Sequence, residues 1–225
     1  PMSWGSWILL IVYPLSFLLI LATLRQGFPK VSSFLENSGR SPLKRGFVRL
    51  LEFSEQHIRL IAKMTIPAGI LLGIYTGILL SAFSARPFWN SSIIGPIFLV
   101  SGISTATALV VLFSKKREER EFFTKTDLGL IVAEVSLLVL FIIGMLSSSE
   151  QHVKAAQLIL GGELTTYFWV FVVGLGLLLP AFLEFMELKG QKIPHTIAAC
   201  LVLFGGILLR FLMVKAGQVS TWIEY

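Results

Sequence analysis

The sequence predicts an all-α integral membrane protein with six membrane-spanning helices. The chain of 225 residues is 55% hydrophobic and 14% charged, with a mean hydropathy of +0.80, whereas a soluble domain usually has about 25% charged residues. Six apolar stretches are each long enough to cross a bilayer core, which takes about 20 residues in a helix. Their hydropathy does not alternate along the chain, so a transmembrane β-barrel is set aside.

The six predicted spans are separated by five connections of very different length. The spans run approximately from Trp4 to Leu24, Ile66 to Phe83, Ile93 to Phe113, Leu128 to Leu146, Tyr167 to Met186 and Thr196 to Val214. We treat residues 1–225 as a single transmembrane domain. Its longest connection, residues 30–63, has a turn-rich piece at 32–41, followed by apolar residues at helical spacing among basic ones. That pattern predicts an amphipathic helix on the inner membrane surface, leading into the second span.

The second span and the loop after it, Gly69 to Asn90, organise the rest of the chain. Small residues recur there at every fourth position and predict one ridge along a helix, at which another backbone can approach closely: Gly69, Gly73, Gly77, Ser81 and Ala85. Tyr75 lies about 200° around the helix from this ridge and roughly 15 Å from the start of the span. A phenol hydroxyl near the bilayer midplane needs a hydrogen-bonding partner.

The distribution of basic residues predicts the orientation. The first, third and fifth connections hold 15 Lys and Arg residues, and the second connection, the fourth connection and the end of the chain hold three. Because cytoplasmic loops accumulate positive residues, both ends of this chain are expected to face away from the cytoplasm. The net charge of +6 therefore reflects topology rather than nucleic-acid binding. We interpret the charge run at 115–127 as a solvated cytoplasmic turn that contacts anionic lipid.

Ionisable residues inside the spans are candidates for function, because each costs roughly 2.5 kcal/mol or more to insert. Glu134 lies in the cytoplasmic half of the fourth span, where it is either a proton carrier or a protonated carboxyl bonded to a neighbouring helix. Glu184 and Glu187 are expected at the solvated inner end of the fifth span. Arg210 is deep in the last span and should find a carboxylate, a carbonyl or a ligand oxygen, whereas Lys215 can reach the outer interface.

The loop that ends in Trp89 and Asn90 adds further hydrogen-bond donors to the predicted outer half. Trp89 is interpreted first as an interfacial aromatic anchor and second as a ligand contact. Asn90 either caps the third span or touches a ligand. With Tyr75 and Arg210, these residues gather donors on one face of the protein.

The chain carries none of the residues that would make it a redox centre by itself. One cysteine, Cys200, supplies neither a disulfide framework nor an iron–sulfur site. The three histidines lie outside the centres of the apolar segments, so a haem ligated within the bundle is not expected. Nucleotide-binding glycine motifs and the nucleophile-elbow pattern are also absent.

Four segments resemble the NrfD/PsrC family of membrane anchor subunits: PMSWGSW at the start, GIYTGILLSAFSARPFWN, FWVFVVGLGLLLPAFLE, and LLRFLMVKAGQ near the end. The resemblance implies an eight-helix fold of two four-helix bundles, located in the cytoplasmic membrane of a prokaryote. The six spans would match the last six of the eight, with the N-terminus incomplete.

The resemblance also implies a quinone-binding subunit without haem or an iron–sulfur cluster, not catalytic alone. Its quinone, menaquinone or ubiquinone, would exchange electrons with an extracytoplasmic iron–sulfur subunit and a molybdopterin or haem catalytic subunit. The tyrosine of the family's YTG motif is a quinone ligand, and Tyr75 and Thr76 occupy that motif here. Our predicted quinone site comprises Tyr75, Thr76, Trp89, Asn90 and Arg210, with Glu134 for proton transfer.

Two other function classes remain open. A small secondary transporter would show inverted repeats and spans broken at corresponding positions, and the prolines within the spans do not correspond in this way. A purely structural anchor for a peripheral redox subunit would leave Tyr75, Glu134 and Arg210 without a task.

Overall fold

The computed structural model describes residues 2–30, 33, 42–83, 85–191 and 194–220. The chain forms two compact units, Pro1–Leu72 and Gly73–Tyr225. All of the regular secondary structure in the described residues is helical, and six helical segments are long and apolar enough to cross a membrane. The predicted class, an all-α integral membrane protein with six spans, is confirmed.

The first unit contains α1 (Met2–Gly27), α3 (Pro42–Gln56) and the larger part of α4 (Ile58–Ser81), up to Leu72. Helix α3 packs against α1, and its Leu51 side chain is fully buried. Arg25 Nη1 of α1 lies 2.8 Å from Glu55 Oε2 of α3. The helix predicted after residue 41 is therefore α3, and it is separate from α4. The turn-rich piece predicted at 32–41 lies, apart from residue 33, outside the described residues.

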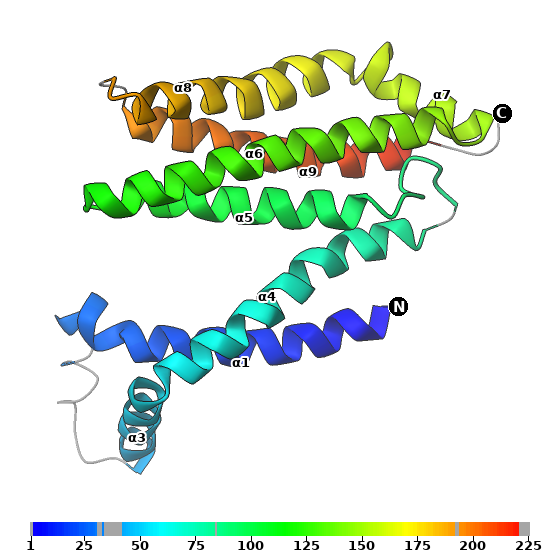
Figure 1. The fold of residues 1–225 in the computed structure, drawn as a ribbon. Coiled ribbons are helices and arrows are strands. Elements are labelled where there is room, and N and C mark those ends of the chain that lie inside the picture. Colours follow the sequence, from blue (N-terminus) through cyan, green and yellow to red (C-terminus); the bar gives the residue numbers. More distant parts are fainter. Residues whose placement is uncertain (1, 31–32, 34–41, 84, 192–193, 221–225) are drawn as a thin grey trace. The chain divides into compact units, whose positions relative to one another are not determined.

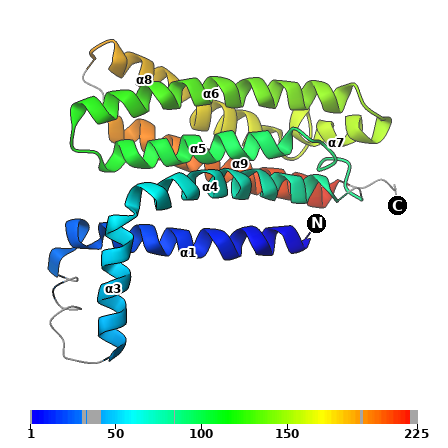
Figure 2. The ribbon, with the colours of Figure 1, turned by 60° about the horizontal axis from the view of Figure 1, so that its bottom comes forward.

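The second unit is built around a bundle of long helices (Figures 1 and 2). Its segments are α5 (Ile94–Phe113), α6 (Arg117–Leu146), α7 (Glu150–Leu160), η1 (Tyr167–Leu178), α8 (Leu179–Leu188) and α9 (His195–Val219). Helix α5 packs against α6 and α9, and α9 also packs against η1 and α8. The short helix α7 lies where α6 ends, after a turn at Ser147.

The two ends of this bundle differ, and we name them by one residue each. At the Arg117 end, α5 and α8 finish while α6 and α9 begin (Figure 1). The Trp89 end holds the loop before α5, helix α7 and the last turn of α9. Our charge-based prediction assigns the Arg117 end to the cytoplasm, and this orientation stays a prediction.

Two predicted boundaries were wrong. Helix α6 begins at Arg117 rather than Leu128, so most of the charge run is helix and not a turn. Helix α4 runs from Ile58 to Ser81, so Ala85 is not on its ridge. Hydropathy finds only the apolar part of a helix, and Glu, Lys and Arg are good helix formers that extend it beyond the apolar core.

Glycines allow two close helix crossings inside the second unit. Gly77 of α4 lies directly against the backbone of Gly95 in α5, and a Cβ at Gly73 would lie 3.0 Å from Leu99 Cδ1. The ridge predicted at these two positions is thus confirmed. Gly176 of η1 and Gly205 of α9 meet in the same manner. A Cβ at Gly77, Gly176 or Gly205 would collide with the backbone of the facing helix, so a side chain at these three positions would force the helices apart.

Segment η1 is wound as a π-helix of 12 residues and continues directly into α8. Pro180, near the start of α8, offers no N–H group and its ring crowds the carbonyl one turn earlier in an ordinary α-helix. Wider winding before the proline relieves that conflict, and π segments are often found at functional sites.

Candidate functional site

Buried polar side chains run along the interior of the second unit in an arrangement we call the polar seam. Helix α5 contributes hydroxyl groups spaced by three residues, α6 contributes a hydroxyl and two carboxyl groups, and α8 contributes one carboxyl group. All are at most 6% exposed: Ser101, Ser104, Thr107, Thr124, Asp127, Glu134 and Glu184. Polar groups so deep in an apolar bundle are costly and mark a functional site by default.

Glu134 and Arg210 form the part of the seam nearer the Trp89 end. Glu134 is 2% exposed, and its carboxylate attracts the half-buried guanidinium of Arg210 across the bundle. Arg210 Nη1 also donates to the carbonyl of Gly206, at 2.9 Å. The prediction that Arg210 would find an oxygen partner inside the bundle is confirmed.

Two glycines make room for the Arg210 guanidinium. A Cβ at Gly102 of α5 would lie 3.4 Å from Arg210 Nη2, and one at Gly206 of α9 would lie 3.3 Å from Nη1. A Cβ at Gly206 would also collide with the methyl group of Thr105. Substituting Gly206 would therefore crowd the guanidinium that faces Glu134, whereas a Cβ at Gly102 would only touch it.

Glu134 and Arg210 belong to one local group rather than to opposite halves of the membrane, as the sequence had suggested. Because α6 starts early, Glu134 is the eighteenth of its 30 residues and lies near the middle of the helix. Ser101 of α5 approaches the Glu134 carboxyl, although its Oγ has no hydrogen bond of ordinary geometry to any described residue.

Asp127 lies two helical turns from Glu134 along α6, about 10 Å towards the Arg117 end. Its side chain is completely buried. Ser104 Oγ donates to Asp127 Oδ1 at 2.7 Å. Thr107 Oγ1 lies 2.9 Å from the same oxygen and 2.7 Å from the Ser104 carbonyl, so its single proton serves only one of them.

Glu184 was predicted at a solvated interface, and that prediction was wrong. The side chain is 4% exposed, because α8 packs against α6 and α9 and turns this position inward. Its carboxyl group lies within hydrogen-bonding reach of the Asp127 carboxyl. Oδ2 of Asp127 and Oε2 of Glu184 have no hydrogen-bond donor among the described residues.

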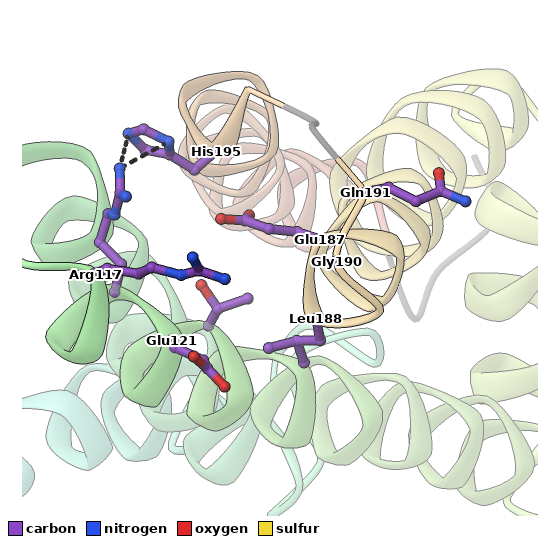
Figure 3. A pocket seen from close by; sticks show the side chains of 9 residues that line it. Arg117, Glu121, Glu187, Leu188, Gly190, Gln191 and His195 are labelled. Atoms are coloured by element: carbon purple, nitrogen blue, oxygen red, sulfur yellow. Dashed lines mark hydrogen bonds between the residues drawn. The ribbon is translucent and has the colours of Figure 1, made fainter.

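A pocket of about 410 Å³ opens at the Arg117 end of the bundle. Figure 3 shows the carboxylate of Glu187 pointing towards Arg117, with Gln191 directed away. Arg120 Nη1 lies 3.2 Å from Nδ1 and 3.3 Å from Nε2 of His195, so it can donate to whichever ring nitrogen lacks a proton. Thr124 also lines the pocket, and its Oγ1 is buried without a partner in the described part of the chain.

Trp89 and its loop fasten α5 to the end of α9. Trp89 Nε1 donates to the carbonyl of Met213 at 2.9 Å, and the indole lies over Gly217, which has no side chain to obstruct it. Arg86 Nη1 donates to the carbonyl of Ser220 at 2.8 Å. The indole N–H is thus engaged within the protein. Asn90 is exposed and does not cap α5, whose N-cap is Ile93.

Tyr75 and Thr76 lie in the last part of α4. Tyr75 is half-buried, six residues and about 9 Å before the helix ends at Ser81. It is therefore farther from the centre of its helix than the predicted span implied. Thr76 is exposed, and its Oγ1 donates to the carbonyl of Gly73 at 2.9 Å.

The structure brings together only part of the predicted site. Glu134 joins Arg210, and Trp89 joins the last turns of α9. Among the described residues, no three His, Cys, Asp or Glu side chains could together hold a metal ion. Reasoning from the sequence missed the pair formed by Asp127 and Glu184. The spacing of Ser101, Ser104 and Thr107 along one face of an apolar span was a signal that could have located their partners.

The fold and the seam define a multi-pass helical membrane protein with buried ionisable groups. The chain belongs to the NrfD family: the family described as polysulphide reductase, NrfD, matches residues 1–221. No solved structure matches the chain.

Relatives extend this family assignment. The chain is similar to the C chain of polysulfide reductase from Wolinella succinogenes, with 34% identity over 94% of this chain and 73% of that protein. Similarity to protein NrfD of Escherichia coli is 38% identity over 67% of this chain and 50% of that protein. The C subunit of selenate reductase from Mesobacillus selenatarsenatis is 24% identical over 75% of this chain and 42% of that protein. The chain spans about half the length of several curated relatives.

Proposed function

We propose that this chain is the quinone-reactive membrane subunit of a respiratory reductase complex. The observation that carries the proposal is the buried Glu134 facing the half-buried Arg210, in the bundle of a chain that belongs to the NrfD family. A structural anchor would have no use for such a pair, which is costly in a membrane. A quinone supplies the chemistry that moves electrons and protons together.

The quinone-binding residues remain those predicted from the sequence. Tyr75 can donate its phenol to a carbonyl oxygen of the headgroup, and Arg210 can stabilise negative charge on it. Thr76, Trp89 and Asn90 complete the proposed set. Thr76 and Trp89 already donate to backbone carbonyls, so each would bind a ligand only by releasing that bond.

Glu134 is the proposed proton-transfer residue. While Arg210 faces it, the carboxylate is stabilised as an anion. When Arg210 turns to a ligand oxygen, Glu134 loses this stabilisation and takes a proton, which then moves to or from the Arg117 end. On our predicted orientation that end faces the cytoplasm, so the protons would be exchanged on the cytoplasmic side.

The proposed partners are an iron–sulfur subunit and a molybdopterin or haem catalytic subunit. Polysulfide and selenate reductases each include a relative of this chain by name. The surface we propose for docking lies at the Trp89 end, on residues 86–92 and 150–163. This surface is uneven, because it includes helix α7 and an open hollow of about 500 Å³ lined by Lys154, Gln157 and Leu160. A partner subunit could fit into that hollow.

Quinone-induced thermal stabilisation tests the proposal directly. A short-chain quinone should raise the melting temperature of the purified chain. The Tyr75→Phe variant should need about ten times more quinone for the same rise, as expected for the loss of one hydrogen bond. Tyr167→Phe is the matched control, because Tyr167 is an exposed phenol at the start of η1. A parent protein that quinone does not stabilise would contradict quinone binding, and equal shifts in both variants would remove Tyr75 from the site.

A further inference from the structure

The strongest unexplained feature of the molecule is the pair of carboxyl groups of Asp127 and Glu184. Both are buried, and each has one oxygen without a hydrogen-bond donor among the described residues. Two ionised carboxylates at hydrogen-bonding range in an apolar bundle repel one another and cannot hydrogen-bond. A single proton between them removes one charge and supplies the missing donor at once.

Among the described residues, no cation forms an ion pair with either carboxyl group, and Arg117, Arg120 and His195 line the pocket at the Arg117 end. Helix α5 faces Asp127 with the hydroxyl groups of Ser104 and Thr107. Helix α8 adds the further negative charge of Glu187, and α6 adds that of Glu134. The ion pairs found among the described residues do not involve Asp127 or Glu184. On α9, Arg210 acts on Glu134 instead.

Thr124 lies close in sequence to Asp127 and also lines the pocket at the Arg117 end, without a direct hydrogen bond to either carboxyl group of the pair. It lies one turn before Asp127 on the same face of α6, it lines the pocket, and its hydroxyl oxygen has no partner among the described residues. A water molecule in a polar pocket of about 410 Å³ has room and partners to bond this hydroxyl. A hydroxyl group both donates and accepts, so with water on each side it can pass a proton between the pocket and the carboxyl pair.

We propose that Asp127 and Glu184 share one proton and exchange it with water in the Arg117-end pocket by way of Thr124. Each transfer breaks one O–H bond and forms another, with no change of oxidation state. In the direction of Glu134, the hydroxyl groups of Ser104 and Ser101 continue the seam on α5. The shared proton would serve as a reservoir for quinone chemistry, so its purpose rests on the proposed function. Its presence can be tested without quinone.

Infrared difference spectroscopy of the purified full chain tests the shared proton. At neutral pH the parent should show the C=O stretching band of a buried, protonated carboxylic acid, and Glu184→Gln and Asp127→Asn should each remove it. Glu187→Gln is the matched control and should keep the band. A parent without the band, or a band that keeps its full intensity in both variants, would overturn the proposal; Glu134→Gln identifies any part of the band that belongs to Glu134. Glu184→Gln keeps the side-chain shape, so the test stands even if the Asp127 variant fails to fold.

Transfer of the same protein into D2O tests the route. Thr124→Val removes the hydroxyl without changing the shape and should slow the deuterium shift of the band about tenfold, the effect of one lost hydrogen bond on a rate. Thr126→Val is the control, because the Thr126 hydroxyl bonds to the carbonyl of Phe122 outside the seam. Equal exchange in the two variants would overturn the route. If quinone fails to stabilise the chain while the band and its exchange behave as expected, the proposed function fails and this inference stands.

Discussion

Helix α6 carries two buried acids on one face, and their surroundings are opposite. Glu134 faces the guanidinium of Arg210, whereas Asp127, two turns away, faces a second carboxyl group on Glu184. A cation beside a buried carboxyl favours its anion, and a like charge favours its protonated form. The same side-chain chemistry on the same helix therefore meets a cation at one site and a second carboxyl group at the other.

The difference follows from which helix each acid meets. At the level of Glu134, glycines in α5 and α9 leave space for a long guanidinium side chain. At the level of Asp127, α5 offers short hydroxyl side chains and α8 turns Glu184 inward. Whether a cation or a second carboxyl group faces the acid is thus decided by small and polar residues, which stand out little in a hydropathy profile.

The largest expected effect comes from removing the acid that faces the cation. Glu134→Gln leaves Arg210 without its counter-charge, and an arginine cannot discharge itself by losing a proton. Breaking a fully buried pair costs about 3–5 kcal/mol. Because Arg210 is half-buried, we expect a loss of about 2 kcal/mol in the free energy of unfolding, measured in mixed detergent micelles. The double variant Glu134→Gln with Arg210→Gln should recover part of the loss. An unchanged single variant would show that the two side chains do not interact.

A smaller effect is expected from the hydroxyl groups that serve each acid. Ser104→Ala removes the donor to Asp127 Oδ1, so we expect a loss of about 1.5 kcal/mol, the usual range for a hydrogen bond to an acidic group. Ser101→Ala is the matched control on the same helix face, and it should change the free energy of unfolding by less than about 0.5 kcal/mol, because Ser101 Oγ has no well-formed hydrogen bond to a described residue. Equal losses would mean that Glu134 depends on its hydroxyl neighbour as much as Asp127 does.

The number of spans, the close contacts at Gly73 and Gly77, and the position of Glu134 and Arg210 inside spans could be predicted from the sequence. Apolar length and four-residue spacing are local properties, and a charge in an apolar run is conspicuous in one dimension. Glu184 could not be placed correctly, because it stands near the end of an apolar run and only the packing of α8 shows that it points inward. Asp127 was hidden by the charge run before it, which looked like the end of a loop.

The smallest effect is expected from the same Glu→Gln substitution at Glu184. This variant is also the sharpest test of the comparison between the two sites. Glu184→Gln replaces the protonated partner of Asp127 with an amide of the same shape, whose N–H groups can donate to Oδ2 of Asp127, an oxygen without a donor among the described residues. No cation loses its partner, and the amide takes over the donor role of the shared proton. We therefore expect the free energy of unfolding to change by less than about 0.5 kcal/mol, against the loss expected for Glu134→Gln, when both variants are measured side by side in the same micelles. A loss at Glu184 as large as that at Glu134 would show that both acids are held as charged partners, and the contrast between the two halves of the polar seam would then be wrong.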